Sequence, residues 1–200
     1  MNFFRKTILM CAVILTTLMI GLSIVGQRVL RHPLPVLGKV SDFTLYDSDA
    51  REFSLNKLNG KVFVTDFIFT TCGSICPLMS QNMASVYRSF IAHNDARFVS
   101  ITVNPEYDSP EILTQYARRY RADTQKWYFL TGSRATIENL AIKSFKLGSV
   151  KEPLFHSGYF VLVDKKSQIR GYYAGTQTTE IRRLLADIAR LLAENGNGPS

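Results

Sequence analysis

The chain has 200 residues, of which 46% are hydrophobic and 20% are charged, and its formal net charge is +8 at pH 7. This apolar content, with 13 Phe and 9 Tyr, excludes a disordered chain and predicts one well-packed domain beside a membrane segment. The basic residues neither alternate with aromatic residues nor form a known module, which argues against nucleic-acid binding. We interpret groups such as Arg118, Arg119 and Arg121 as solvated helix faces, with an acidic partner as the alternative.

Residues 1–26 predict a membrane anchor. The run from Thr7 to Gly26 contains twenty residues and no charge, enough to cross a hydrocarbon core of ~30 Å at 1.5 Å per helical residue. Because Arg5 and Lys6 precede the run, we expect a single-pass protein of the bacterial inner membrane, with its soluble domain in the periplasm or outside. A cleaved signal peptide is the alternative, but the run is long for one and lacks an A-x-A-like cleavage site.

A linker and a short hairpin are expected next. Residues 27–39 contain two prolines and no periodicity, so we interpret them as a linker to a domain at 40–195. Residues 42–47 and 52–55 predict the hairpin. The run 61–69, KVFVTDFIF, is almost continuously apolar and therefore predicts a central strand buried on both faces.

The rest of the domain alternates helices and strands. We expect helices from Pro77, from Ser109-Pro110, from Ser133 and over 181–192, and strands at 97–103, 127–130, 159–163 and 169–173. Helical spacing predicts core faces made by Met79, Met83, Val86 and Phe90 and by Ile112, Tyr116 and Tyr120. Residues 196–200 are expected to be disordered. This order predicts an α/β, thioredoxin-like fold, with a central mixed β-sheet flanked by helices and a cysteine pair after its first buried strand.

Cys72 and Cys76 are the two thiols of the soluble domain, because Cys11 lies in the apolar run. Fully extended, residues four apart lie ~13 Å from each other, whereas a disulfide needs Cα atoms within about 4.4 to 6.8 Å. The segment must therefore turn, which Gly73 permits, and Pro77 then starts a helix whose N-terminus favours thiolate. The pair supports dithiol–disulfide exchange or a soft metal equally, whereas a purely structural disulfide across so short a loop gains little.

His156 is the candidate third member of the site. It lies just before the strand at 159–163, where thioredoxin-like folds bring a second loop against the cysteine loop. Two thiolates and one imidazole suit copper, as Cu(I) or Cu(II), whereas a structural zinc site would need a fourth protein ligand. His32 and His93 lack such a context, and we expect both to be exposed.

Asp66 lies in the predicted buried strand, six residues before Cys72. A buried carboxylate is costly unless it is paired or protonated. One hypothesis is that Asp66 tunes the thiol pKa values, as a buried Asp at the same spacing does in thioredoxin. The alternative is a strand-edge Asp hydrogen-bonded to backbone. Met79 and Met83 are close to the cysteines, but their spacing favours packing over metal binding.

The stretch FTTCGSICP at 69–77 resembles the motif of the Sco/SenC family, F-T-x-C-x-x-x-C-P followed by a histidine about 80 residues on. The segments 41–45, 103–110 and 130–133 also resemble the family, and the similarity extends over about residues 40 to 193. The resemblance implies that Cys72, Cys76 and His156 bind copper and that the cysteines cycle between dithiol and disulfide. It also implies partners: the copper-site subunit of cytochrome c oxidase, the membrane and a thiol reductant.

Two functions are therefore carried forward. The first is copper delivery to, or thiol reduction of, the copper centre of the oxidase during its assembly. The second is an extracytoplasmic thiol–disulfide oxidoreductase to which copper is incidental. A peroxiredoxin-like peroxidase is excluded, because that chemistry needs Thr three residues before its cysteine and Phe69 holds the position. Phe155 and Asn104 stand where the family usually has Asp, which alters the acidic surroundings of the site.

Overall fold

The computed structural model describes residues 10, 14–17, 19, 33–148 and 158–194. The chain divides into two units, Met1–Leu34 and Pro35–Ser200. Residues 14–17 of the first unit are helical, and within the described ranges no helix is both long enough and apolar enough to cross a bilayer. Most of the predicted anchor and the predicted tail at 196–200 lie outside the described residues.

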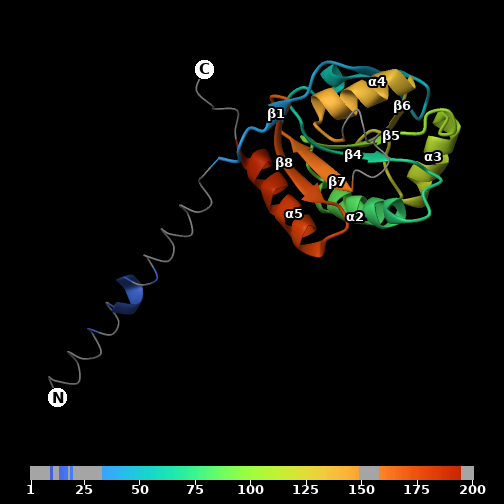
Figure 1. Cartoon of the computed structure of the whole chain (residues 1–200). Coiled ribbons are helices and arrows are strands. Elements are labelled where there is room, and N and C mark those ends of the chain that lie inside the picture. The colour runs from blue at the N-terminus through green and yellow to red at the C-terminus, as the bar shows by residue number, and fades with distance from the viewer. Residues whose placement is uncertain (1–9, 11–13, 18, 20–32, 149–157, 195–200) are drawn as a thin grey trace. The chain divides into compact units, whose positions relative to one another are not determined.

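The second unit is built on an eight-stranded mixed sheet with the strand order β1-β8-β7-β4-β5-β6-β2-β3 (Figure 1). The central strands β4, β5 and β6 are parallel, and β7 and β8 continue the sheet as an antiparallel hairpin beside β4. The strands are β1 (Gly38–Lys39), β2 (Thr44–Asp47), β3 (Glu52–Ser54), β4 (Val62–Ile68), β5 (Ala96–Thr102), β6 (Trp127–Thr131), β7 (Tyr159–Val163) and β8 (Gln168–Ala174). This is the thioredoxin-like plan that the sequence predicts.

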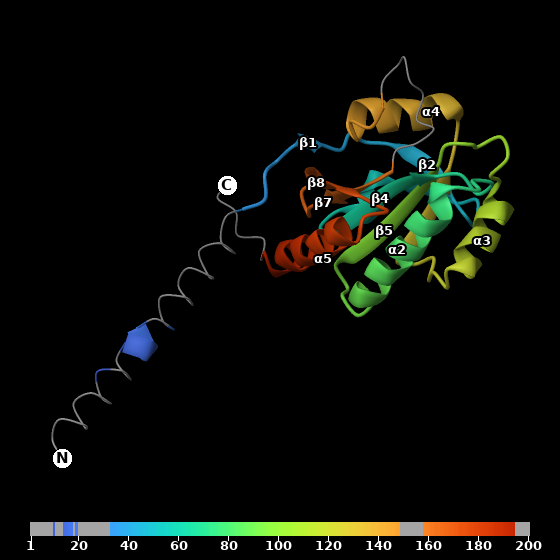
Figure 2. The same ribbon diagram turned by 60° about the horizontal axis from the view of Figure 1, so that its bottom comes forward.

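Helices cover both faces of the sheet. Helix α4 lies on one face, and α2 and α5 lie side by side on the other (Figure 2). The helices are α2 (Ile75–Phe90), α3 (Pro110–Arg119), α4 (Arg134–Asn139) with its π-helical continuation Leu140–Ser144, and α5 (Thr178–Ala193); a 3-10 turn spans Leu55–Leu58. Ser109 and Ser133 cap α3 and α4, as predicted, because their side chains accept hydrogen bonds from Ile112 N and Thr136 N.

Strand β4 is buried along its whole length, which confirms the prediction made from its apolar run. Side chains alternate across a strand, so Phe63 and Phe67 join the core beneath α4, while Asp66 faces the layer of α2. Helix α2 buries its predicted face of Met79, Met83, Val86 and Phe90. On α3 the buried residues are Leu113, Tyr116 and Ala117, so the face lies one position away from Ile112.

The first residues of the second unit lie along the sheet edge. Leu37 N donates to Ile169 O at 2.8 Å, and β1 pairs with β8. The Arg170 guanidinium also donates to Pro35 O at 3.2 Å. These bonds belong to residues 35–39, which the prolines and missing periodicity led us to read as linker. Backbone pairing at an edge needs no apolar pattern, so the sequence did not reveal it.

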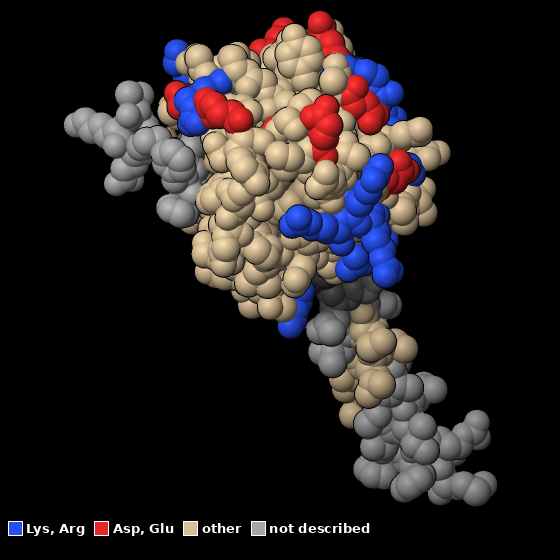
Figure 3. Space-filling view, turned by 90° about the vertical axis from the view of Figure 1, so that its right-hand side faces the viewer, with Lys and Arg blue, Asp and Glu red and all other residues tan. Residues whose placement is uncertain are grey.

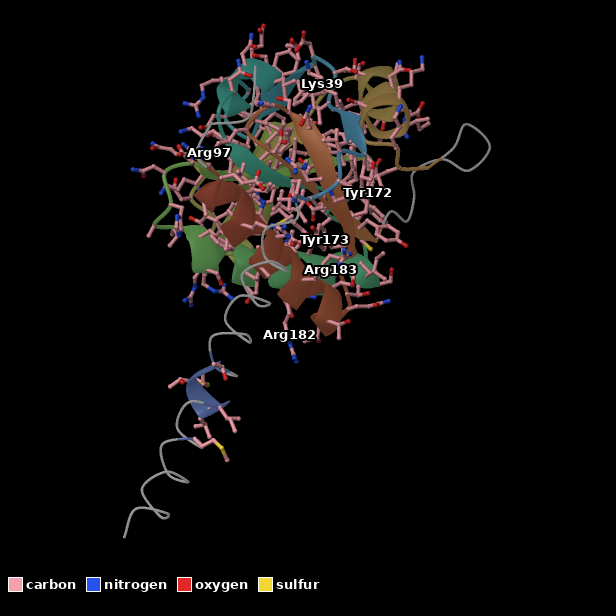
Figure 4. The ribbon with its side chains drawn as sticks, turned by 90° about the vertical axis from the view of Figure 1, so that its left-hand side faces the viewer. Lys39, Arg97, Tyr172, Tyr173, Arg182 and Arg183 are labelled. Atoms are coloured by element: carbon pink, nitrogen blue, oxygen red, sulfur yellow. The ribbon has the colours of Figure 1, made fainter. Side chains whose placement is uncertain are left out.

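Helix α5 is fixed to β8 by an aromatic and charged contact. The Arg183 guanidinium lies over the ring of Tyr173 at 4.3 Å from its centroid (Figure 4). The Tyr173 hydroxyl donates to Asp187 Oδ2 at 2.8 Å, and Arg183 donates to Tyr172 O at 2.9 Å. Together these contacts hold the C-terminal helix against the hairpin.

Basic side chains gather on the side of the molecule that carries α3 (Figure 3). Arg118 and Arg119 lie in the last turn of this helix and are exposed, as is Arg121 just beyond it. Their exposure agrees with a solvated helix face.

The core predicts a sharp difference between two leucines. Leu130 on β6 is 0% exposed, whereas Leu78 on α2 is 46% exposed. Leu130→Ala should lower the free energy of unfolding by about 2 to 5 kcal/mol, because it leaves a cavity in a packed core. Leu78→Ala is the matched control and should change it by about 0.5 kcal/mol or less. Urea unfolding compares the two, and equal losses would contradict the packing described here.

Candidate functional site

The cysteine loop connects the end of β4 to the start of α2. Cys72 lies in the loop, where its amide donates to Phe69 O at 3.2 Å and closes a turn. Cys76 lies in the first turn of α2. Both thiols are free, and they are only 7% and 5% exposed. The two side chains are within hydrogen-bonding reach, because each thiol influences the pKa of the other through a hydrogen bond. The structure thus brings together the two cysteines of the predicted pair, one on a loop and the other on a helix.

The two thiols differ in acidity. Burial raises the pKa of Cys72, but hydrogen bonds from the Ser74 side chain and from the amides of Cys76 and Ser74 outweigh it, and the pKa falls to about 7. Burial raises the pKa of Cys76 to about 12. Thiolates, not thiols, are the reactive form of cysteine, so Cys72 is the more readily ionised thiol of the pair near neutral pH. Cys76 keeps its proton until a base or a metal ion removes it.

Asp66 lies in β4 and is 0% exposed. Its Oδ1 accepts a hydrogen bond from Ser100 Oγ at 2.6 Å, and Ser100 Oγ in turn accepts one from Trp127 Nε1 at 3.0 Å. Its Oδ2 has no hydrogen-bond partner among the described residues. Burial raises the pKa of Asp66 to about 7, although the Ser100 bond opposes the rise. The charge of Asp66 also raises the pKa of Cys76, so the carboxyl group and this thiol are electrostatically coupled.

The loop is also held by a residue that our sequence reasoning did not select, Asp108, which lies in the connection between β5 and α3. Asp108 is 0% exposed, and its carboxylate accepts hydrogen bonds from Thr70 N at 3.1 Å and from Thr70 Oγ1 at 2.5 Å. In the sequence, Asp108 stands next to the Ser109-Pro110 helix start, where a polar residue is expected anyway. Because Thr70 and Asp108 are 38 positions apart in the chain, their contact produces no periodic pattern in the sequence.

The start of β7 lies against α2. A Cβ on Gly158 would lie 3.8 Å from Ile75 Cδ1. Gly175 N donates to Gly158 O at 2.7 Å, and Asn82 Nδ2 on α2 donates to Gly175 O at 2.7 Å. His156 lies outside the described residues. Among those that are described, no three His, Cys, Asp or Glu side chains form a group that could hold a metal ion.

We also considered two methionines and two other histidines for the site, and the structure describes three of these four residues. Met79 and Met83 are 0% exposed, and Met79 packs close to Gly175, as expected for core residues. His93 is exposed and its ring contacts Phe90 at 5.6 Å between centroids. His32 lies outside the described ranges.

Comparisons with known proteins give one consistent result. The family model SCO1/SenC matches residues 36–193. A SCO1 protein homolog of Bacillus subtilis is 35% identical over 170 residues, which are 82% of this chain and 86% of that protein. The structure of BsSco, a member of the Sco family of cytochrome c oxidase assembly proteins in which a disulfide switch was identified, matches with a TM-score of 0.70. The two sequences are 32% identical, and the match covers 82% of this chain and 100% of the BsSco chain.

A more distant structure shows how widely the fold is shared. ScoI of Bradyrhizobium japonicum, which was solved with copper bound, matches with a TM-score of 0.63 at 21% identity. The match covers 77% of this chain and 99% of ScoI. With the family model matching nearly the whole of the second unit, and with the cysteine pair at the end of a central strand, this chain belongs to the SCO1/SenC family.

Proposed function

We propose that this protein binds copper outside the cytoplasm and takes part in assembly of the copper centre of cytochrome c oxidase. The observation that carries the proposal is the contact between Cys72, in the loop after β4, and Cys76, in the first turn of α2. The residue before β7, Gly158, lies beside Ile75 of the same helix. The membrane anchor at 1–26 and the partner, the copper-site subunit of the oxidase, belong to the proposal.

The donor set fits a soft metal ion. Cys72 and Cys76 offer two sulfur atoms, and thiolates are the preferred ligands of Cu(I). His156 is the third proposed ligand. It stands two residues before Gly158, so the chain between them spans at most about 7 Å. Gly158 itself lies beside Ile75, in the helix that carries Cys76. Copper is cargo here, which the protein holds and passes on.

The acidity of the two thiols also supports exchange with a disulfide of the partner. The Cys72 thiolate attacks one partner sulfur and forms a mixed disulfide, and the other partner sulfur leaves as a thiolate. Cys76 then loses its proton and attacks Cys72 Sγ, which releases the second partner thiolate. Two electrons pass to the partner, and Cys72 and Cys76 end as a disulfide. A separate thiol reductant must restore the dithiol, which is the third partner that we propose.

Asp66 is our candidate for the group that tunes this step. Its pKa of about 7 suits a group that takes and returns a proton near neutral pH. Its influence on the pKa of Cys76 gives it a thiol on which to act.

A thiol–disulfide oxidoreductase that meets copper only incidentally is the second candidate. The specific observation in its favour is the pKa of Cys72, about 7, because a thiolate at neutral pH serves exchange without a metal. The two candidates differ in their need for His156.

Replacing His156 separates the two functions. His156→Ala should weaken Cu(II) binding by at least about tenfold to a hundredfold, because a ligand is lost, while dithiol exchange persists. Cys72→Ser should abolish both. The measurements are copper content and the Cu(II) absorption spectrum of the full-length protein, with His93→Ala as the control that keeps both properties. Unchanged Cu(II) binding in His156→Ala would refute the proposed ligand set.

Replacing Asp66 tests its effect on the thiols. Burial is the main cause of the raised pKa of Cys76, and the negative charge of Asp66 adds a smaller part. Asp66→Asn removes that charge, so the pKa of Cys76 should fall by this smaller part. Titration of the thiolate absorbance in the copper-free, reduced protein measures it. Thiol pKa values that are the same in both proteins would end the tuning hypothesis.

The same substitution should change how stability depends on pH. The pKa of Asp66 is about 7 in the folded protein against the ordinary value of 3.8, so its protonated form favours folding. This contribution is fully present below pH 3.8 and is lost as the pH rises to about 7. Between these limits the wild type should lose roughly 4 kcal/mol relative to Asp66→Asn. Urea unfolding at several pH values measures the difference, and parallel profiles would contradict a buried, titrating carboxyl group.

A further inference from the structure

The carboxylate of Asp108 joins the ends of two neighbouring central strands. Besides the two bonds from Thr70, its Oδ2 accepts a hydrogen bond from Thr102 Oγ1 at 2.5 Å. Thr102 is the last residue of β5, and Thr70 follows the last residue of β4 by two positions. Burial of a carboxylate is costly without hydrogen bonds, and charge-assisted hydrogen bonds are stronger than neutral ones. These three bonds therefore form a strong connection between the two strand ends.

Asp108 is itself held firmly. Its amide donates to Asn104 O at 2.9 Å, and Tyr107 N donates to the same oxygen at 3.1 Å. Asn104 N donates to Thr102 Oγ1 at 3.0 Å, so the hydroxyl of Thr102 connects both ends of this turn. The next residue, Ser109, caps α3. The carboxylate is thus attached to a strand, a tight turn and a helix, and it accepts two hydrogen bonds from Thr70 of the cysteine loop.

Thr70 determines where the loop cysteine lies. It stands two residues before Cys72, inside the turn that the bond from Cys72 N to Phe69 O closes. Cys76 is held independently, because it belongs to α2, whose buried face packs on the sheet. The distance and direction between the two sulfur atoms depend on the hydrogen bonds of Cys72 Sγ to Ser74 and Cys76 and also on how firmly the residues before Cys72 are fixed.

We propose that Asp108 is a positioning residue of the cysteine pair: through Thr70 it holds Cys72 in place opposite Cys76. It touches neither sulfur, and it acts through geometry. The inference rests on the proposed function only in taking the two thiols as a pair that forms a disulfide.

Substitutions of Asp108 separate geometry from charge. Asp108→Ala removes all three acceptor bonds. Asp108→Asn can keep them, because its oxygen can replace Oδ2, which accepts from Thr70 N and Thr102 Oγ1. Its amide NH2 can then replace Oδ1 and donate to the Thr70 hydroxyl, which also has lone pairs to accept. If Asp108 acts by positioning, disulfide formation should be weakened in Asp108→Ala and should be close to that of the wild type in Asp108→Asn.

Asp164 supplies a matched control. It too is a buried Asp, 7% exposed, and it accepts hydrogen bonds from Lys166 N and Gln168 N and from the Arg170 guanidinium. It lies at the opposite end of the sheet from the cysteine loop, because the preceding Val163 pairs with Phe63 near the start of β4. Asp164→Ala should destabilise the fold without reaching the cysteine pair.

The test is the equilibrium between the Cys72–Cys76 disulfide and glutathione in the copper-free, full-length protein. In Asp108→Ala the equilibrium constant for disulfide formation should fall by about tenfold, because a loosened loop lowers the effective concentration of one thiol at the other. In Asp108→Asn and Asp164→Ala it should stay within about twofold of the wild type. Urea unfolding of each variant records its loss of stability separately.

Three results would overturn the inference. The first is an unchanged equilibrium constant in Asp108→Ala. The second is an equal fall in Asp164→Ala, which would indicate general destabilisation, and the third is an equal fall in Asp108→Asn, which would indicate charge. If Asp108→Ala does not fold, Thr70→Val removes one bond to Asp108, and Thr102→Val removes one such bond together with the bond from Asn104 N. Each should lower the equilibrium constant by a smaller amount, and an unchanged constant in both variants would also overturn the inference. Any of these results leaves the His156→Ala copper experiment unaffected, whereas a wild type that forms no disulfide would overturn the proposed redox step as well.

Discussion

Burial of β4 on both faces is the constraint on which the site depends. Every residue of this strand is buried, so it cannot shift along its neighbours without moving apolar side chains out of two cores. The loop with Cys72 and the helix with Cys76 both follow this strand, and Asp66 belongs to it. The pairing of β4 with β5 also brings Thr70 within reach of Asp108. Because the strand cannot shift, the reactive side chains at its carboxyl end are held in constant positions.

The site combines groups whose burial costs stability with groups that hold them in place. The environment separates the pKa values of the thiols, to about 7 for Cys72 and about 12 for Cys76. It also leaves one oxygen of Asp66 without a hydrogen-bond partner within the described residues. An apolar residue at position 66 would pack at lower cost. A buried carboxyl group that influences the pKa of Cys76 is what proton transfer to or from that thiol would require.

Much of the fold could be predicted from the sequence, since the patterns are local. The apolar run of β4 predicts its burial directly. The same holds for the buried face of α2, which helical spacing predicts to consist of Met79, Met83, Val86 and Phe90. On α3 only Tyr116 of the predicted face is buried, because Ile112 and Tyr120 are partly exposed and Leu113 and Ala117 are buried instead. Helix α3 has only ten residues, and two adjacent apolar residues, Ile112 and Leu113, could each face the core. Its sequence therefore does not define which side of the helix packs on the sheet. The Asp108 contact could not be predicted at all, because a hydrogen bond between distant loops depends on strand order and register.

The central claim is that copper is bound by two sulfur atoms and one histidine nitrogen of this chain. X-ray absorption spectroscopy of the copper-loaded, full-length protein tests it most directly, because it identifies the atoms around the metal. Our account predicts two sulfur ligands and an imidazole signal in the Cu(II) form, with the imidazole signal lost in His156→Ala. Copper surrounded by nitrogen and oxygen alone, or an imidazole signal that persists in His156→Ala, would contradict it.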